Sequence, residues 1–313
     1  AGRYGPLLGR TIDPDTEVTV TSGCTEALAA SFLGLVNPGD EVVLIEPYYD
    51  AYPAYVAMAG AIPRFVRLRA PGFALDFDEL RKAFNTRTRA IVLNNPHNPT
   101  GRVFTIEELR AVAELCIEFD VIVIADEVYE EMTYGMGHVR IASLPGMWER
   151  TLTLSSLGKT FSLTGWKLGW AIGPPNLMAG LRSAHQFLTF TTPTPMQHGA
   201  VSAMDAPESF FGEMRRSYQT KRDLLASGLQ DLGFDVHLPE GTYFLMAGFE
   251  AFGFDSDREF ARHMAEDVGV VAIPPSGFYY DPAGAANLIR FAFCKDESTL
   301  TEALDRLSKL GRR

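Results

Sequence analysis

Two lysines have the clearest chemical potential in this sequence, and both lie in residues 155–170, SSLGKTFSLTGWKLGW. Lys159 stands among small residues just after an apolar run, residues 151–155, that is typical of a core strand. A lysine in such a place can form a Schiff base with a carbonyl cofactor, provided that burial or a nearby cation lowers the pKa of the amine. Lys167 could be that cation, or it could hold a cofactor's phosphate group. The alternative is that both lysines belong to a solvent-facing loop.

Five apolar segments precede residues that could surround such a lysine. The segments are EVTVT (residues 17–21), EVVLIE (Glu41–Glu46), RAIVLN (residues 89–94), VIVIA (residues 121–125) and TLTLS (residues 151–155). The residues that follow them are Gly23 and Thr25, Tyr49, Asn98, Asp126 and Lys159. Ligand sites of an open α/β sheet lie beyond the carboxyl ends of its strands, so we expect these residues to converge. VIVIA is the most continuous β-branched run, which predicts a place in the middle of a parallel sheet.

Two of the connections after these segments have recognisable local structure. Ser22, Gly23, Cys24 and Thr25 stand between a strand and a segment of helical spacing, where backbone N–H groups and the helix dipole can hold a phosphate. Many strand-to-helix turns look like this without binding anything. After the irregular loop NNPHNPTG, Thr105 and Glu108 form a capping box that predicts the start of a helix.

The pattern changes after about residue 205, which predicts a large domain over residues 1–204 and a smaller α+β domain over residues 205–313. A long polar helix is expected at about residues 207–232, another helix at 257–268 and a last one from Glu297. Strands are expected at residues 235–238, 242–248, 270–273 and 288–293. Arg290 stands on the otherwise apolar strand LIRFAF.

Composition narrows the classes of function. The 313 residues carry a net charge of -11 without a long basic block, which argues against nucleic acid or an anionic membrane as the main partner. The three cysteines are far apart and the six histidines are dispersed, so neither a disulfide framework nor a zinc site is expected. No stretch is long and apolar enough to span a bilayer, and the first residues are unlike a signal peptide. We therefore expect a cytoplasmic protein.

Two other motifs are compatible with parts of this sequence. Gly158, Lys159 and Thr160 could end a phosphate-binding P-loop, but the first glycine of that motif would fall at Thr153, and the acidic strand precedes the lysine loop. The carboxylates of Asp126, Glu127, Glu130 and Glu131 could hold a metal. We expect instead that Glu130 and Glu131 lie on a solvated face.

Six motifs together resemble a known family. TSGCTEAL, EPYYDAY, NNPHNPTG, ADEVYE, SSLGKTFSLTGWKLGW and LIRFAFCKDE are similar, in this order, to the motifs of class I, fold-type I pyridoxal-phosphate aminotransferases. Within that class the chain most resembles the kynurenine aminotransferase and cysteine-S-conjugate β-lyase group, from about residue 17 onward. The resemblance implies a large α/β domain with a mostly parallel sheet sandwiched by helices, a smaller α+β C-terminal domain, and pyridoxal 5′-phosphate as cofactor.

The resemblance also implies roles for single residues. Lys159 would form the Schiff base and then move a proton as general base and acid, while Asp126 would pair with the pyridinium nitrogen. Tyr129 and Asn98 would bond the ring hydroxyl, and Tyr49 would stack on the ring. The phosphate would be held by Gly23, Cys24 through its backbone only, Thr25, Ser156 and Lys167. Arg290 would clamp the substrate's α-carboxylate, with Asn98 beside it.

The activity expected from this resemblance is transfer of an amino group from an aromatic or sulfur-containing amino acid, kynurenine among the candidates, to a 2-oxo acid. The alternatives are a C–S β-lyase on the same scaffold, or an inactive cofactor-binding homologue. The last is suggested because relatives carry an N-terminal arm and lid before the equivalent of residues 4–10, so this sequence is either a fragment or has lost them. The family implies a homodimer, with Thr191 and Thr192 as candidates to reach across its interface.

Overall fold

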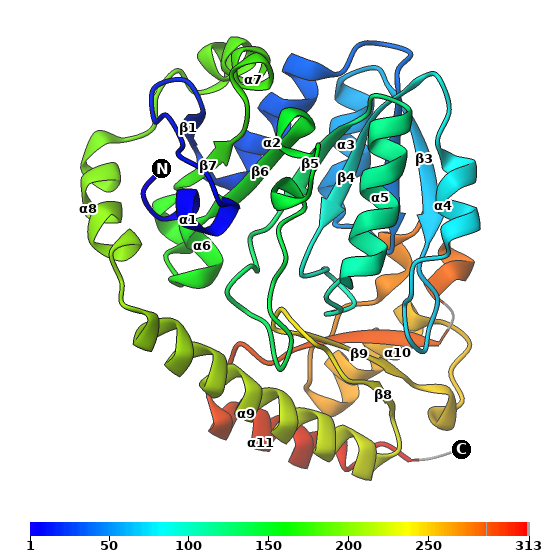
Figure 1. Ribbon diagram of the computed structural model, residues 1–313. Coiled ribbons are helices and arrows are strands. Elements are labelled where there is room, and N and C mark those ends of the chain that lie inside the picture. The colour runs from blue at the N-terminus through cyan, green and yellow to red at the C-terminus, as the bar shows by residue number, and fades with distance from the viewer. Residues whose placement is uncertain (286, 312–313) are drawn as a thin grey trace.

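The computed structural model describes residues 1–285 and 287–311, and a seven-stranded sheet forms its centre. The strands stand in the order β1-β7-β6-β5-β4-β2-β3 (Figure 1). Their bounds are β1 Val18–Thr21, β2 Glu41–Glu46, β3 Ile62–Arg67, β4 Thr88–Asn94, β5 Ile122–Asp126, β6 Thr151–Ser156 and β7 Gly169–Ile172. Pairing is parallel from β3 through β6, and β7 runs antiparallel to both of its neighbours. The expected mostly parallel sheet, with the VIVIA strand at its middle, is confirmed.

Helices cover both faces of this sheet, because its central strands are apolar on both sides. Ile122 and Ile124 of β5 pack in one hydrophobic cluster, whereas Val123 and Ala125 pack in another, as the alternation of side chains along a strand requires. Helices α2 (Gly23–Leu35), α3 (Ala51–Met58) and α7 (Pro175–Leu188) contribute to the first cluster. Helices α4 (Phe77–Ala83) and α5 (Ile106–Glu118) contribute to the second. The expected sandwich of helices around the sheet is therefore confirmed.

Local signals set the bounds of several helices. The capping box predicted for Thr105 and Glu108 is present at the start of α5, with both of its hydrogen bonds formed. Shorter helices, α1 (Tyr4–Leu8) and α6 (Leu157–Thr160), lie near the carboxyl end of β6, and α8 (Thr194–Met204) lies at the outer edge of the molecule (Figure 1). Single 3-10 turns are found at Ile141–Ser143, Trp148–Arg150, Thr164–Trp166, Glu250–Phe252, Pro275–Phe278 and Pro282–Ala285.

The C-terminal part has its own antiparallel sheet, in the order β10-β9-β8. It consists of α9 (Glu208–Leu232), β8 (Asp235–His237), β9 (Phe244–Gly248), α10 (Asp257–His263) with a π-helical turn at Met264–Val268, β10 (Leu288–Ala292) and α11 (Glu297–Leu307). Its separate core is rich in phenylalanine, and α9 and α11 pack side by side along it (Figure 1). The smaller α+β unit is confirmed. The boundary between residues 204 and 205, which falls between α8 and α9, stays a prediction.

The strand expected at residues 270–273 is not formed, and this prediction was wrong. Only a single bridge joins Ile273 to Arg290 of β10. Val271 is 78% exposed, and Pro274 and Pro275 follow directly. Proline has no backbone N–H to donate, so the ladder cannot continue past the bridge. A short run of apolar residues was therefore not enough to make a strand.

Candidate active site

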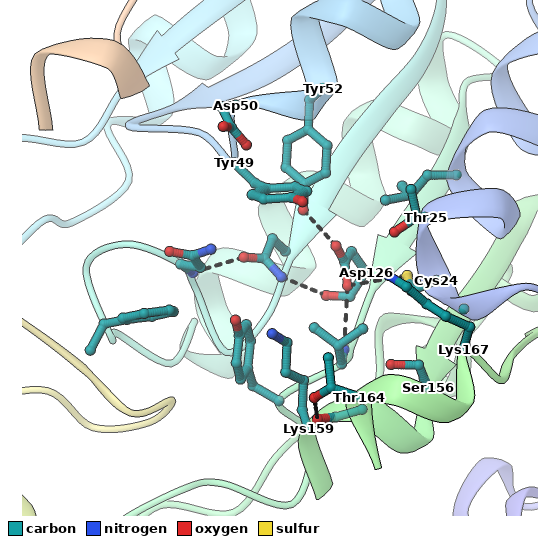
Figure 2. Close-up of a pocket in the computed structure, with 18 of the residues that line it drawn as sticks. Cys24, Thr25, Tyr49, Asp50, Tyr52, Asp126, Ser156, Lys159, Thr164 and Lys167 are labelled. Carbon is teal, nitrogen blue, oxygen red and sulfur yellow. Dashed lines mark hydrogen bonds between the residues drawn. The ribbon is translucent and has the colours of Figure 1, made fainter. Parts of the chain in front are cut away.

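All eleven residues predicted to form the site line one cavity of about 430 Å³ at the carboxyl ends of the parallel strands (Figure 2). They are Gly23, Cys24, Thr25, Tyr49, Asn98, Asp126, Tyr129, Ser156, Lys159, Lys167 and Arg290. Eight of them come from the loops and helices that follow β1, β2, β4, β5 and β6. Asp126 and Ser156 are the last residues of β5 and β6, and Arg290 comes from β10 of the smaller sheet. The topology thus brings together residues that are up to 267 positions apart in the sequence (Gly23 to Arg290).

Asp126, the last residue of β5, is the buried acid of the cavity, with 4% of its surface exposed. The hydroxyl of Tyr52 donates to its Oδ2 at 2.7 Å, and the backbone N–H of Val128 donates to its Oδ1 at 3.3 Å. Burial raises the pKa of Asp126, and these hydrogen bonds, Tyr52 foremost, act in the opposite direction. The donors stabilise the ionised form that desolvation disfavours.

Cys24 makes a contact that was not predicted. Its expected backbone contact with the phosphate stays a prediction, and its Sγ lies 3.7 Å from Oδ1 of Asp126, as a weak hydrogen-bond donor. Cys24 occupies the first turn of α2, which packs on the sheet, so its side chain faces inward and is buried. Burial, followed by the nearby Asp126 carboxylate, raises the pKa of the thiol well above its usual value. The thiol therefore keeps its proton and remains a donor.

Lys159 lies in the short helix α6, directly after the end of β6. Its Nζ is 2.9 Å from the hydroxyl oxygen of Tyr243 and 5.7 Å from the centre of the Tyr129 ring. The Tyr129 and Tyr243 rings meet edge to face at 5.5 Å, and burial raises the pKa of Tyr129 well above its usual value. The amine thus lies between two phenol rings, one from the loop after β5 and one from the residue before β9.

Arg290 and Asn98 form the opposite wall. Nη1 of Arg290 donates to Oδ1 of Asn98 at 2.9 Å, and the guanidinium lies over the rings of Phe244 and Phe278. Its Nε is buried and has no hydrogen-bond partner among the described residues. Burial lowers the pKa of Arg290 from its ordinary value. A half-buried guanidinium whose Nε has no partner is a binding place for a carboxylate.

The remaining wall has the properties of a phosphate site. Gly23, with φ at 71°, starts the 13-residue helix α2, whose first N–H groups have no partners within the helix. A Cβ on Gly169 would lie 2.5 Å from the backbone of Gly23, so β7 can approach this turn only because it has glycine there. Ser156 and the exposed Lys167 add a hydroxyl and a cation. A phosphorylated cofactor with a basic ring nitrogen fits these residues: the phosphate at α2, the nitrogen at Asp126 and its aldehyde toward Lys159.

The comparisons with known proteins agree with this arrangement. The family model described as aminotransferase class I and II matches residues 6–307. The chain belongs to this family. Enzymes of the family depend on pyridoxal phosphate, so the expected cofactor and enzyme class are confirmed.

Solved and curated relatives of this aminotransferase have different substrates in their names. The structure of N-succinyldiaminopimelate aminotransferase from Mycobacterium tuberculosis is 47% identical with a TM-score of 0.96, covering 99% of this chain and 82% of its own. Human kynurenine–oxoglutarate transaminase 1 is 43% identical over 99% of this chain and 81% of its own length. YbdL from Escherichia coli, described with a methionine aminotransferase function, is 38% identical with a TM-score of 0.94. The match covers 99% of this chain and 81% of YbdL. The similarity to the kynurenine aminotransferase group is confirmed, and the names of these relatives give three different amino-group donors.

Several residues of the aminotransferase site were missed from the sequence. Tyr52 lies one helical turn after the predicted Tyr49, and nothing local indicates that its hydroxyl reaches Asp126. Tyr243 and Phe244 fall within the strand expected at residues 242–248, without a role in the site. Phe278 lies outside every expected helix and strand. In each case the partner lies far away in the sequence, so periodicity gave no signal.

The acidic residues after β5 correct another expectation. Glu130 was expected on a solvated face, but only 7% of it is exposed. It accepts hydrogen bonds from Tyr4, Ser155 and Arg140, which explains why a carboxylate is tolerated there. Glu131 is partly exposed and pairs with Arg3 and Arg215. Among the described residues no group of three or more acidic, histidine or cysteine side chains is arranged to hold a metal ion.

Proposed function

We propose that this aminotransferase moves an amino group from a neutral aromatic or sulfur-containing amino acid, kynurenine among the candidates, to a 2-oxo acid. The observation that carries the proposal is the charge of the cavity wall. Its described lining has three cations, Lys159, Lys167 and Arg290. If Lys159 and Lys167 serve the cofactor, Arg290 alone is left for the substrate's carboxylate. The residues around it, Phe244, Phe278 and Ile273, are apolar and suit a side chain without further charge.

The proposed roles divide the cavity among the chain's own residues. Bound pyridoxal phosphate supplies an aldehyde that condenses with amines and a ring that accepts electrons. Asp126 would keep a proton at the ring nitrogen, and the amine of Lys159 would take the proton from the substrate's Cα and deliver it to the carbon of the cofactor's aldehyde group. Arg290 and Asn98 hold the α-carboxylate, which orients the Cα–H bond toward Lys159. The other assigned roles are ring contacts by Tyr49, Tyr129 and Asn98, and phosphate contacts by Gly23, Cys24, Thr25, Ser156 and Lys167.

A substrate panel tests this proposal. Purified protein with pyridoxal phosphate is assayed with kynurenine, phenylalanine, methionine, N-succinyl-diaminopimelate and an S-substituted cysteine, with and without a 2-oxo acid. We expect turnover that depends on the 2-oxo acid, with kcat/KM highest for a neutral amino acid. Preference for N-succinyl-diaminopimelate would overturn the proposal, because that substrate has carboxylates for which the described wall has no second free cation. Release of pyruvate and ammonia without a 2-oxo acid would favour the C–S lyase. Absence of any turnover would favour the inactive homologue.

We also propose a homodimer that uses the surface of α7 and α8. No residue of α8 is buried, and Phe187 and Phe190 are 86% and 71% exposed. Two such phenylalanines so close together are unusual on a surface that faces only water. Thr191 is exposed beside them, whereas Thr192 is buried and accepts a hydrogen bond from Gln197. Of the two threonines, Thr191 is thus the better candidate to reach a partner.

Light scattering tests the dimer. The protein is expected to have twice the mass of the chain, and Phe187→Glu is expected to give monomers, because a charge on each side would be buried at the interface. Phe77→Glu is the matched control, since Phe77 is also an exposed phenylalanine, at 50%, but lies on α4 at the opposite side of the sheet. If the Phe187→Glu variant is still a dimer, another surface forms the interface.

The cytoplasmic location stays a prediction. Cys24, Cys116 and Cys294 are all free, which fits a reducing compartment. None of the helices in the described part of the chain has the length and apolarity to cross a membrane. Cell fractionation with an antibody is the measurement that checks the location.

A further inference from the structure

A buried polar cluster lies outside the cavity, behind the strand ends that carry the candidate site. Its centre is Glu130, whose carboxylate accepts hydrogen bonds from three side chains. Tyr4 donates from α1, Ser155 donates from β6 at 2.8 Å, and Arg140 donates from the loop after β5. All three donors are buried as well, at 8% exposure or less. The charge of Glu130 is therefore balanced and held at a fixed point in the interior.

The members of this cluster adjoin residues of the cavity. Glu130 follows Tyr129, and Ser155 stands four residues before Lys159. The Glu130–Ser155 bond thus connects two segments: residues 126–130, with Asp126 and Tyr129, and residues 155–159, with Lys159. The backbone adds only one nearby connection, from the N–H of Glu127 to the carbonyl oxygen of Leu154 at 2.9 Å. Beyond that point residues 127–130 leave the sheet, whereas Ser155 and Ser156 still pair with β7. Among the described residues the β5–β6 ladder therefore no longer joins the two segments.

We infer that Glu130 is a positioning residue of the active site, which acts by holding Ser155. Its carboxylate keeps the segment of Tyr129 at a set distance from the segment of Lys159. The inference rests on the proposed function, because it assumes that Lys159 and Tyr129 act on the cofactor and substrate. Displacements of a fraction of an ångström between such groups lower a rate strongly, although binding of the substrate's carboxylate at Arg290 is untouched.

The purely structural alternative is that Glu130 only neutralises Arg140 and anchors α1. Two variants separate the alternatives, because each removes one hydroxyl donor from the same carboxylate and leaves the charge pair intact. Ser155→Ala breaks the connection to β6, whereas Tyr4→Phe breaks the connection to α1. Glu130→Gln removes the charge from all three contacts. Glu131→Gln is the matched control for a neighbouring glutamate, since Glu131 pairs with Arg3 and Arg215 at the surface.

For Ser155→Ala we expect kcat to fall about tenfold while KM for the amino acid stays within about twofold, since the substrate clamp is unchanged. The pH midpoint of the absorbance of the bound cofactor, which reports the surroundings of Lys159, is expected to shift in the same variant. Tyr4→Phe is expected to keep kcat and this midpoint and to lower the melting temperature. Glu130→Gln is expected to combine both effects, and Glu131→Gln to have neither.

The inference would be overturned if kcat and the midpoint were the same in wild type, Ser155→Ala and Glu130→Gln. It would also be overturned if kcat fell as much in Tyr4→Phe as in Ser155→Ala. The absorbance titration needs no turnover. A wild-type protein that binds the cofactor at Lys159 but transaminates none of the substrates would refute the proposed function, and the midpoints would still decide the role of Glu130. If no cofactor is bound at Lys159, both proposals are wrong.

Discussion

Replacing Lys159 with alanine is expected to lower turnover by about 10⁴-fold, because the variant loses the only amine placed to move the Cα proton. Nζ of Lys159 lies beside the hydroxyl of Tyr243 and above the ring of Tyr129, and no other lysine side chain among the described residues has this place. The absorbance of the lysine-linked cofactor is expected to disappear as well. Steady-state assays and the spectrum of the protein mixed with pyridoxal phosphate measure the two effects.

Lys167→Ala is the matched control, since Lys167 is the other lysine that lines the cavity. It is expected to keep the covalent linkage and to weaken cofactor binding, because Lys167 stands at the N-terminus of α2 and supplies charge to the phosphate. Borohydride reduction followed by peptide mapping locates the linkage directly. A reduced adduct on the peptide with Lys167, or none on the peptide with Lys159 in cofactor-saturated protein, would contradict the assignment.

Asp126→Asn is expected to keep the cofactor but to lose most of the rate, by about 10²-fold or more, because a neutral amide does not hold a proton at the ring nitrogen. Lys159 and the phosphate site are untouched by the change, so cofactor binding should persist. Single-turnover kinetics with an amino acid alone measure the step that depends on the electron sink. Cofactor content, measured after release in base, confirms equal loading of both proteins.

Asp120→Asn is the matched control at the opposite end of the same strand. The side chain of Asp120 is 92% exposed and its φ is 54°, a conformation that asparagine tolerates well. We expect its kinetics to equal those of the wild type. Full activity in Asp126→Asn would show that another group supports the ring nitrogen.

The cofactor-free protein gives Asp126 a second, independent readout. Burial raises the pKa of this carboxyl above the value it has in the unfolded chain, so the folded protein binds its proton more tightly. The contribution to stability is therefore fully present below the unfolded pKa, and it is lost as pH rises through the folded pKa. An asparagine at this position does not titrate, so Asp126→Asn lacks this loss of stability. As pH rises from the acidic range toward neutrality, the melting temperature of the variant should therefore rise relative to that of the wild type.

The sequence by itself determined the scaffold and most of the cavity. Apolar runs that are buried on both faces can form only inner strands of a covered sheet, and β2, β5 and β6 are buried at every position. Parallel strands end at one edge, so the residues after them had to meet. This is why Asp126 and Lys159, named from the sequence, line the same cavity. The capping box of α5 is likewise a property of four adjacent residues.

Tertiary structure alone decided the contacts that depend on pairs distant in the sequence. Tyr52 is 74 residues from Asp126, and Tyr243 is 84 residues from Lys159, so no local pattern indicates either hydrogen bond. Glu130 is of a residue type usually found on the surface, and it is buried only because three donors from other segments surround its carboxylate. The apolar residues 270–273 fail to form a strand because they make a single bridge to β10 and then prolines follow. Burial and pairing of polar groups are properties of the whole packed molecule, whereas the period of apolar residues is a property of the segment itself.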